Sequence, residues 1–113
     1  MGKNIGLAPF RIDDFYPELI TIKNNSSIGW RVNILTHEFT NEYFKFGKVV
    51  IEQNVLIGAF STIRCGVTIG KNSIVAMGSL VLKDIPPNEV WGGVPAKKLM
   101  NKEDYFKIKR KDL

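Results

Sequence analysis

The sequence has little cysteine, little histidine and no long apolar run. Cys65 is the single cysteine among 113 residues, so no internal disulfide can form, which favours a reducing compartment. No stretch approaches the roughly 20 apolar residues that a helix needs to span a bilayer. The first ten residues, MGKNIGLAPF, also lack the apolar segment of a secretory signal. We therefore expect a cytoplasmic protein without a membrane span.

Positive charge is concentrated near the C-terminus. The formal net charge is +5, and residues 97–113 hold seven Lys/Arg against three Asp/Glu. Such a segment suits contact with the phosphates of a nucleotide or nucleic acid, or the solvated face of an amphipathic helix. No base-stacking motif or recognition fold accompanies the charge, so we expect no nucleic-acid partner.

A six-residue period runs through the second half of the chain. A branched aliphatic residue recurs at every sixth position, as Ile51, Ile57, Ile63, Ile69, Val75 and Val81. An earlier stretch keeps the same period with Ile22, Ile28 and Ile34. Amphipathic helices repeat near three and four residues and ordinary strands alternate every two, so neither explains a strict period of six.

A coil with three short flat faces explains this period. Each hexad supplies one brief strand and one corner, and successive circuits stack as parallel strands roughly 4.8 Å apart. The recurring aliphatic residue points inward, while Gly or Asn at the tight corners tolerates positive φ. The spacing predicts an all-β fold, a parallel β-helix of about four coils, with complete circuits at residues 51–68 and 69–86. Ile5 and Leu7 are candidate core residues of an imperfect first coil.

The period fails once, between Ile34 and Ile51. The gap is about eleven residues longer than one hexad, so we predict that residues 35–48 leave the stack as a loop. His37, the only histidine, stands at the root of this loop. Functional residues concentrate on loops of rigid scaffolds, and a histidine can accept a proton near neutral pH. His37 is therefore a candidate general base, and the alternative is a histidine that only packs under the neighbouring aromatic residues.

The repeat is predicted to end after Val81. Pro86-Pro87 blocks a further strand, and Gly92-Gly93 permits a sharp reversal. Asn101 is a plausible N-cap of a short helix over KEDYFKIKRK, which could dock on a partner or on the open end of the coil. The predicted organisation is a β-helix domain at residues 1–100 and a basic helix or tail at 101–113.

Two segments carry a resemblance to a known family. IGAFSTIRCGVTIGKNSIVAMGSLVLKDIPPNEVWGGVPAKKL resembles the C-terminal signature of the hexapeptide-repeat O-acetyltransferases, which include the maltose and galactoside acetyltransferases. ILTHEF, the loop and GKVVIEQNVLIG are similar to the segment around their catalytic histidine. The resemblance implies a left-handed β-helix, a homotrimer with active sites between subunits, and acetyl-CoA as donor. It also implies that His37 is the general base and that the acceptor is a hydroxyl of a sugar or related molecule.

The resemblance implies further site residues. The pantetheine arm of the donor would lie against backbone groups at Gly58, Ala59, Met77 and Gly78. Three lysines match basic or polar positions near the nucleotide end of the donor, namely Lys83, Lys97 and Lys98, although plain solvation explains each equally well. Asp13 and Asp14 are possible acceptor contacts by their place in the family pattern.

Two other functions remain to be weighed. A non-catalytic β-helix that serves only as a trimerisation module would not bind coenzyme A. A hexapeptide-repeat metalloenzyme of the γ-type carbonic anhydrase kind needs several histidine ligands, and this chain has one. We therefore expect no metal, and an acyltransferase remains the preferred function.

Overall fold

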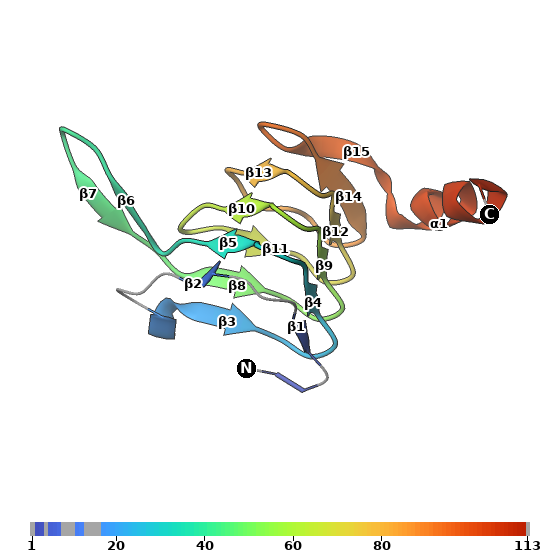
Figure 1. Cartoon of the computed structure of the whole chain (residues 1–113), viewed down its shortest axis with the longest axis horizontal. Coiled ribbons are helices and arrows are strands. Elements are labelled where there is room, and N and C mark those ends of the chain that lie inside the picture. Colours follow the sequence, from blue (N-terminus) through green and yellow to red (C-terminus); the bar gives the residue numbers. More distant parts are fainter. Residues whose placement is uncertain (1, 4, 8–10, 13–16, 113) are drawn as a thin grey trace.

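The computed structural model describes residues 2–3, 5–7, 11–12 and 17–112. The chain winds into a coil with three faces, and on each face short parallel strands from successive circuits form a sheet (Figure 1). Face one contains β1 (Gly6–Leu7), β4 (Ser27–Ile28), β9 (Leu56–Ile57), β12 (Ile74–Val75) and β14 (Glu89–Gly92). Face two contains β2 (Arg11–Ile12), β5 (Asn33–Ile34), β10 (Thr62–Ile63) and β13 (Leu80–Val81). Face three contains β3 (Ile20–Ile22), preceded by the 3₁₀ helix η1 (Pro17–Leu19), with β8 (Val49–Ile51) and β11 (Thr68–Ile69).

The register of these sheets follows the six-residue period. Ile57 pairs with Val75 on face one, a step of 18 residues, and the same step joins Ile63 to Val81 and Ile51 to Ile69. Ile28 pairs with Ile57, a step of 29 residues, because the chain between these coils carries the insertion. All nine periodic aliphatic residues lie in one buried core. The predicted parallel β-helix and its core are therefore confirmed.

The described residues do not test every part of the predicted fold. Ile5 packs against the core as expected, while the side chain of Leu7 lies outside the described part. The number of coils stays a prediction, because the first circuit includes residues 8–10 and 13–16, which are not described. The left-handed sense and the division at residue 100 also stay predictions. No described helix is long and apolar enough to cross a membrane.

The corner between faces three and one, here called the Asn72 corner, requires a left-handed backbone. Its four equivalent residues all have positive φ, at Asn25 (63°), Asn54 (58°), Asn72 (64°) and Asn88 (62°). Asn54 Nδ2 donates to Asn72 Oδ1 at 3.2 Å, and Asn72 Nδ2 donates to Asn88 Oδ1 at 3.0 Å. Asparagine is selected here because it tolerates this backbone and its side chain ties one coil to the next.

Replacing Asn72 with alanine is expected to destabilise the protein by about 1–3 kcal/mol. Alanine pays the left-handed penalty and removes two side-chain hydrogen bonds, whereas Asn72→Gly relieves the backbone and loses only the bonds. Urea denaturation at one fixed protein concentration measures both variants. Equal midpoints for Asn72→Ala and Asn72→Gly would mean that positive φ does not select asparagine at this corner.

The insertion forms an antiparallel hairpin of β6 (His37–Phe39) and β7 (Phe44–Phe46) at the corner between faces two and three, here called the hairpin corner. In Figure 1 this hairpin projects from the left of the coil, away from the other strands. The amide of Gly47 donates to the Thr36 carbonyl at 2.9 Å, which closes the hairpin at its root. The stack then resumes at β8, so the inserted residues leave the core without disturbing its register.

The C-terminal part of the chain, after β13, closes the C-terminal end of the coil. Gly93 has φ of 104° and allows the reversal that was expected, and the chain returns as β15 (Lys97–Asn101), antiparallel to β14. The sequence analysis did not predict β15. The helix α1 (Lys102–Asp112) follows directly, so Asn101 immediately precedes the first helical residue. Trp91 is buried on β14 above Val75 and covers the end of the core.

Candidate active site at the hairpin and the coil corners

His37 is the first residue of β6 and faces the aromatic side of the hairpin. It pairs with Phe46 across the two strands, and its ring stacks on Phe44 with centroids 5.9 Å apart and planes at 23°. Phe44 also contacts Phe39 and Phe46, with centroid distances of 6.2 Å in both cases. Side chains alternate along a strand, so His37 and Phe39 share one face of β6. The half-buried imidazole therefore lies at one end of an exposed aromatic cluster.

The opposite face of the hairpin carries charge. The carboxylate of Glu38 accepts hydrogen bonds from Arg64 Nε at 3.1 Å, Arg64 Nη2 at 2.9 Å and the Tyr43 hydroxyl at 2.9 Å. The bonds from Arg64 and then Tyr43 hold the pKa of Glu38 below its ordinary value. The same contacts with Glu38 raise the pKa values of Tyr43 and Arg64. The sequence analysis gave no role to these three residues.

The predicted donor-binding residues gather at the corner between faces one and two, here called the Ala59 corner. Gly78 N–H donates to the Ala59 carbonyl at 2.8 Å, which stacks the two turns directly. A side chain at Gly58 would place its Cβ 2.5 Å from the amide nitrogen of Met77, so only glycine allows the coils to approach this closely. The structure thus brings Gly58, Ala59, Met77 and Gly78 together in two stacked turns.

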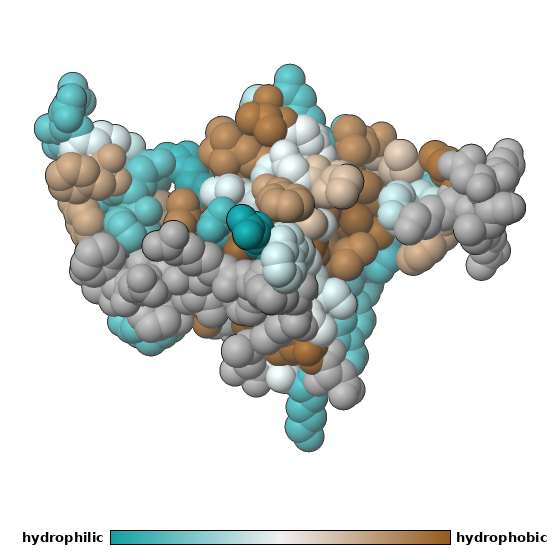
Figure 2. All heavy atoms as spheres, in the orientation of Figure 1, coloured by the Kyte–Doolittle hydropathy of each residue, from teal (hydrophilic) through white to brown (hydrophobic). Residues whose placement is uncertain are grey.

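The Ala59 corner also offers free backbone donors and apolar surface. Within the described residues, the amides of Ala59 and Met77 donate to no backbone carbonyl, while those of Gly58 and Gly78 on either side do. Met77 is 72% exposed, and three neighbouring apolar side chains are also exposed: Trp30, Phe60 and Val94. Figure 2 shows apolar side chains gathered over the upper coils on the face in view. A ligand at this corner could therefore accept backbone hydrogen bonds beside apolar side chains.

One chain does not bring His37 to the Ala59 corner. Face two lies between that corner and the hairpin corner, because β10 (Thr62–Ile63) stands between Ala59 and Arg64 in the chain. His37 and the Ala59 corner therefore lie at different corners of the coil.

The three predicted phosphate-binding lysines have different surroundings. Lys83 Nζ lies 5.6 Å from the centroid of the Trp91 ring. Lys98 forms an ion pair with Glu89 at 3.3 Å, and Lys97 is exposed opposite Gly92. A hydrogen bond from Trp91 Nε1, and then Lys98, hold the pKa of Glu89 below its ordinary value. Lys83 and Lys98 thus both contact residues of β14.

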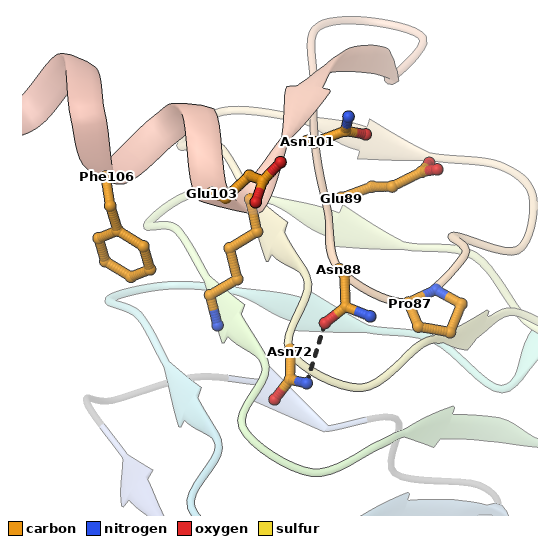
Figure 3. A pocket seen from close by; sticks show the side chains of 8 residues that line it. Asn72, Pro87, Asn88, Glu89, Asn101, Glu103 and Phe106 are labelled. Atoms are coloured by element: carbon orange, nitrogen blue, oxygen red, sulfur yellow. Dashed lines mark hydrogen bonds between the residues drawn. The ribbon is translucent and has the colours of Figure 1, made fainter.

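Other candidates for a site are weaker. A hollow of about 560 Å³ lies between α1 and the Asn72 corner (Figure 3), lined partly by Asn88, Glu103 and Phe106. It contains none of the residues that the sequence analysis selected. Within the described residues, no group of three His, Cys, Asp or Glu side chains could hold a metal ion. Asp13 and Asp14 lie outside the described residues.

Comparison with known proteins now adds to this geometry. Residues 48–83 match the family model described as bacterial transferase hexapeptide (six repeats). The galactoside O-acetyltransferase of Escherichia coli (strain K12) is 38% identical over 108 residues, which cover 85% of this chain and 52% of that protein. The chain spans about half the length of this curated relative.

Solved structures agree with the sequence match. A galactoside acetyltransferase in complex with coenzyme A aligns with a TM-score of 0.77 and 34% identity, over 93% of this chain and 57% of that one. A hexapeptide-repeat-containing acetyltransferase of Vibrio cholerae O1 biovar eltor, complexed with acetyl coenzyme A, aligns with a TM-score of 0.75 and 30% identity. This second alignment covers 89% of the chain and 69% of the Vibrio protein. The chain therefore belongs to the hexapeptide-repeat acetyltransferase family.

Proposed function

We propose that the protein transfers an acetyl group from acetyl-CoA to a hydroxyl of a sugar or related small molecule, with His37 as general base. The observation that carries this proposal is the position of His37, at the root of the hairpin that interrupts a coil of this family. Structures of two relatives contain coenzyme A or acetyl-CoA, and the E. coli relative is named for O-acetylation of a galactoside.

The reaction needs one proton acceptor. In the proposed step, the imidazole of His37 takes the proton of the acceptor hydroxyl while the oxygen attacks the thioester carbonyl carbon. The new C–O bond forms, the C–S bond breaks, and the proton returns to the departing sulfur. The fixed strand β6 and the stacked Phe44 ring hold the imidazole in one orientation for this step.

The Ala59 corner is the proposed site of the donor arm. A pantetheine arm contains amide carbonyls that can accept hydrogen bonds from the free amides of Ala59 and Met77. Its methylene groups suit the exposed Met77 side chain. The lysines Lys83, Lys97 and Lys98 stay proposals for the donor phosphates, and Lys98 would first have to leave Glu89. Asp13 and Asp14 stay proposals for the acceptor.

A homotrimer is the proposed assembly. His37 and the Ala59 corner stand on different edges of the coil, so a site between neighbouring chains supplies both. The exposed apolar side chains along the Ala59 corner, Trp30, Phe60, Met77 and Val94, are the surface that a neighbouring copy would cover. A cyclic trimer would then contain three equivalent sites. A cytoplasmic location is part of the same proposal.

Co-expression of two inactive variants is expected to restore activity. His37→Ala removes the proposed base, and Ala59→Trp fills the other half of the site, so each variant alone should turn over almost no substrate. In randomly mixed trimers about one quarter of the sites join two intact halves. A thioester-consumption assay over a panel of sugars should therefore show roughly a quarter of wild-type activity.

A negative control places both substitutions in one chain. The double variant His37→Ala/Ala59→Trp, expressed alone, contains no intact half of the site and should give no activity. If the mixed trimers stay as inactive as the parents while light scattering shows that they assemble, then both halves belong to one chain.

The alternative function is a non-catalytic trimerisation module. It predicts that coenzyme A does not raise the thermal midpoint of the protein, whereas the midpoint of the proposed enzyme should rise with the logarithm of the coenzyme A concentration above its Kd. A measurable shift with coenzyme A, absent in Ala59→Trp, favours the enzyme.

A further inference from the structure

Glu38, Arg64 and Tyr43 connect three parts of the chain through one carboxylate. Glu38 lies in β6, Tyr43 precedes β7, and Arg64 follows β10 in the next coil. The guanidinium of Arg64 donates to both oxygens of Glu38, and the Tyr43 hydroxyl donates to Oε2. The two charged side chains are 30% and 33% exposed, so neither is fully solvated. Glu38 therefore has a two-point contact with Arg64 of the coil and a third hydrogen bond from Tyr43 within the hairpin.

This contact lies on the face of the hairpin opposite His37. Strand pairing places Glu38 beside Lys45, and His37 with Phe39 on the other side with Phe44 and Phe46. The aromatic face holds the imidazole, and the charged face fastens the hairpin to the coil. Because both faces belong to the same short strand, any rotation of β6 away from Arg64 also moves His37.

We propose that Glu38, Arg64 and Tyr43 form a clamp that positions His37 for catalysis by fixing the hairpin against the coil. This inference rests on the proposed function of His37. Glu38 acts here as a positioning residue, because its carboxylate bonds Arg64 and Tyr43 on the face away from the imidazole. A bidentate arginine–carboxylate pair is suited to this task because its fork geometry defines orientation as well as distance.

The clamp is expected to stay intact through the neutral pH range. The hydrogen bonds from Arg64 and Tyr43 lower the pKa of Glu38. A carboxylate with a lowered pKa contributes its stabilisation above its ordinary pKa and loses it as the pH falls through the folded value. Lys45 on the same face also favours the charged carboxylate. Catalysis near neutral pH would therefore not report on titration of Glu38.

Glu38→Gln tests the clamp, with Glu52→Gln as the matched control. Glu52 forms an ion pair with Lys23 at 2.9 Å with similar exposure, but it lies on the coil away from the hairpin. Glu38→Gln should lower kcat by about ten- to a hundredfold, since misplacement of a reacting group by about 1 Å has such effects. The KM for acetyl-CoA should not change, because the donor corner is intact. Glu52→Gln should match wild type in both constants.

A second measurement needs no substrate. His37 is the only histidine, so its imidazole gives one assignable NMR signal in tag-free protein. Wild type and Glu52→Gln should show one sharp resonance, and Glu38→Gln should show a broadened or split one, because the ring samples several positions. A change in line shape of the Glu38 variant alone separates positioning from a general loss of stability.

Several results would overturn the clamp. Wild-type kcat and line shape in Glu38→Gln would do so, and so would a displaced acid limb of the pH–rate profile, which would make Glu38 a direct partner of the imidazole. Arg64→Lys keeps the positive charge but not the bidentate guanidinium, so wild-type kcat and line shape in this variant would also contradict the proposal. The same variant replaces Glu38→Gln as the test if Glu38→Gln does not fold. If His37→Ala is fully active while Glu38→Gln broadens the signal, the base assignment fails, and the catalytic role of the clamp fails with it although Glu38 still fixes the hairpin against the coil.

Discussion

Replacing His37 with alanine is expected to lower kcat/KM for the acceptor by about a hundred- to ten-thousandfold. This range is what removal of a positioned general base usually costs. Alanine leaves no proton acceptor on the aromatic face of β6, because the Glu38 carboxylate lies on the opposite face, while the Ala59 corner, which would bind the donor, is unaltered. The loss should therefore appear in kcat, with the affinity for acetyl-CoA close to wild type. Steady-state thioester consumption and calorimetric titration with coenzyme A measure the two effects separately.

The controls for His37 use the surrounding aromatic side chains. Phe46→Leu changes the pairing partner of His37 but leaves the imidazole, so it should lose far less activity than His37→Ala. His37→Asn keeps a polar side chain of similar reach and should resemble alanine, because an amide is no base at neutral pH. Turnover at the wild-type rate in His37→Ala would refute the general-base assignment for this protein.

Replacing Ile57 with alanine is expected to destabilise the protein by about 2–5 kcal/mol. Ile57 is completely buried on face one, where it stacks between Ile28 below and Val75 above. The loss combines the removed apolar surface with the cavity left behind, because parallel strands fixed by backbone hydrogen bonds cannot collapse into the gap. Chemical denaturation at a fixed protein concentration measures the change, since assembly would add to apparent stability.

Two neighbouring variants calibrate the Ile57 result. Ile57→Val removes one methylene group and should cost about 0.5–1.5 kcal/mol. Leu56→Ala changes the adjacent residue on the same strand, whose side chain is 41% exposed, and should cost clearly less than Ile57→Ala. Equal losses at positions 56 and 57 would contradict the inward direction of the periodic residue.

Most of the fold could be predicted because the period encodes pairing. Once Ile51, Ile57 and Ile63 are taken as one circuit, their partners eighteen residues later follow, and the structure pairs them so. The departure from the period between Ile34 and Ile51 located the segment that forms β6 and β7. Few folds reveal their long-range contacts in this way, since each strand here has its partner at a fixed distance along the chain.

The C-terminal part could not be predicted in the same way. Glu89 and Lys98 meet only because β14 and β15 turn back on each other, and no period relates them. The lysines were therefore assigned to phosphates from the family resemblance and their charge, and neither indicates that Glu89 and Trp91 lie beside them. A one-chain sequence also cannot show which corner of a neighbouring copy approaches His37.

Arg64 was missed although the period contained a signal for it. Leu35 donates its amide to Ile63, so the residue after Ile63 lies just above the start of the hairpin. Arg64 is a basic residue at that level, and Glu38 is an acidic residue three positions after Leu35, so the two indicate an ion pair between coils.

The constant step of eighteen residues has a consequence for how such a chain can change length. Any circuit, for example residues 51–68, ends in the register in which it begins, so a tandem duplication of it would add one rung and keep every later core residue facing inward. An insertion of another length within a face would turn the following aliphatic residues toward solvent. Evolution could thus lengthen the Ala59 corner in whole rungs of roughly 4.8 Å, while the hairpin at the other corner stays free to vary in length.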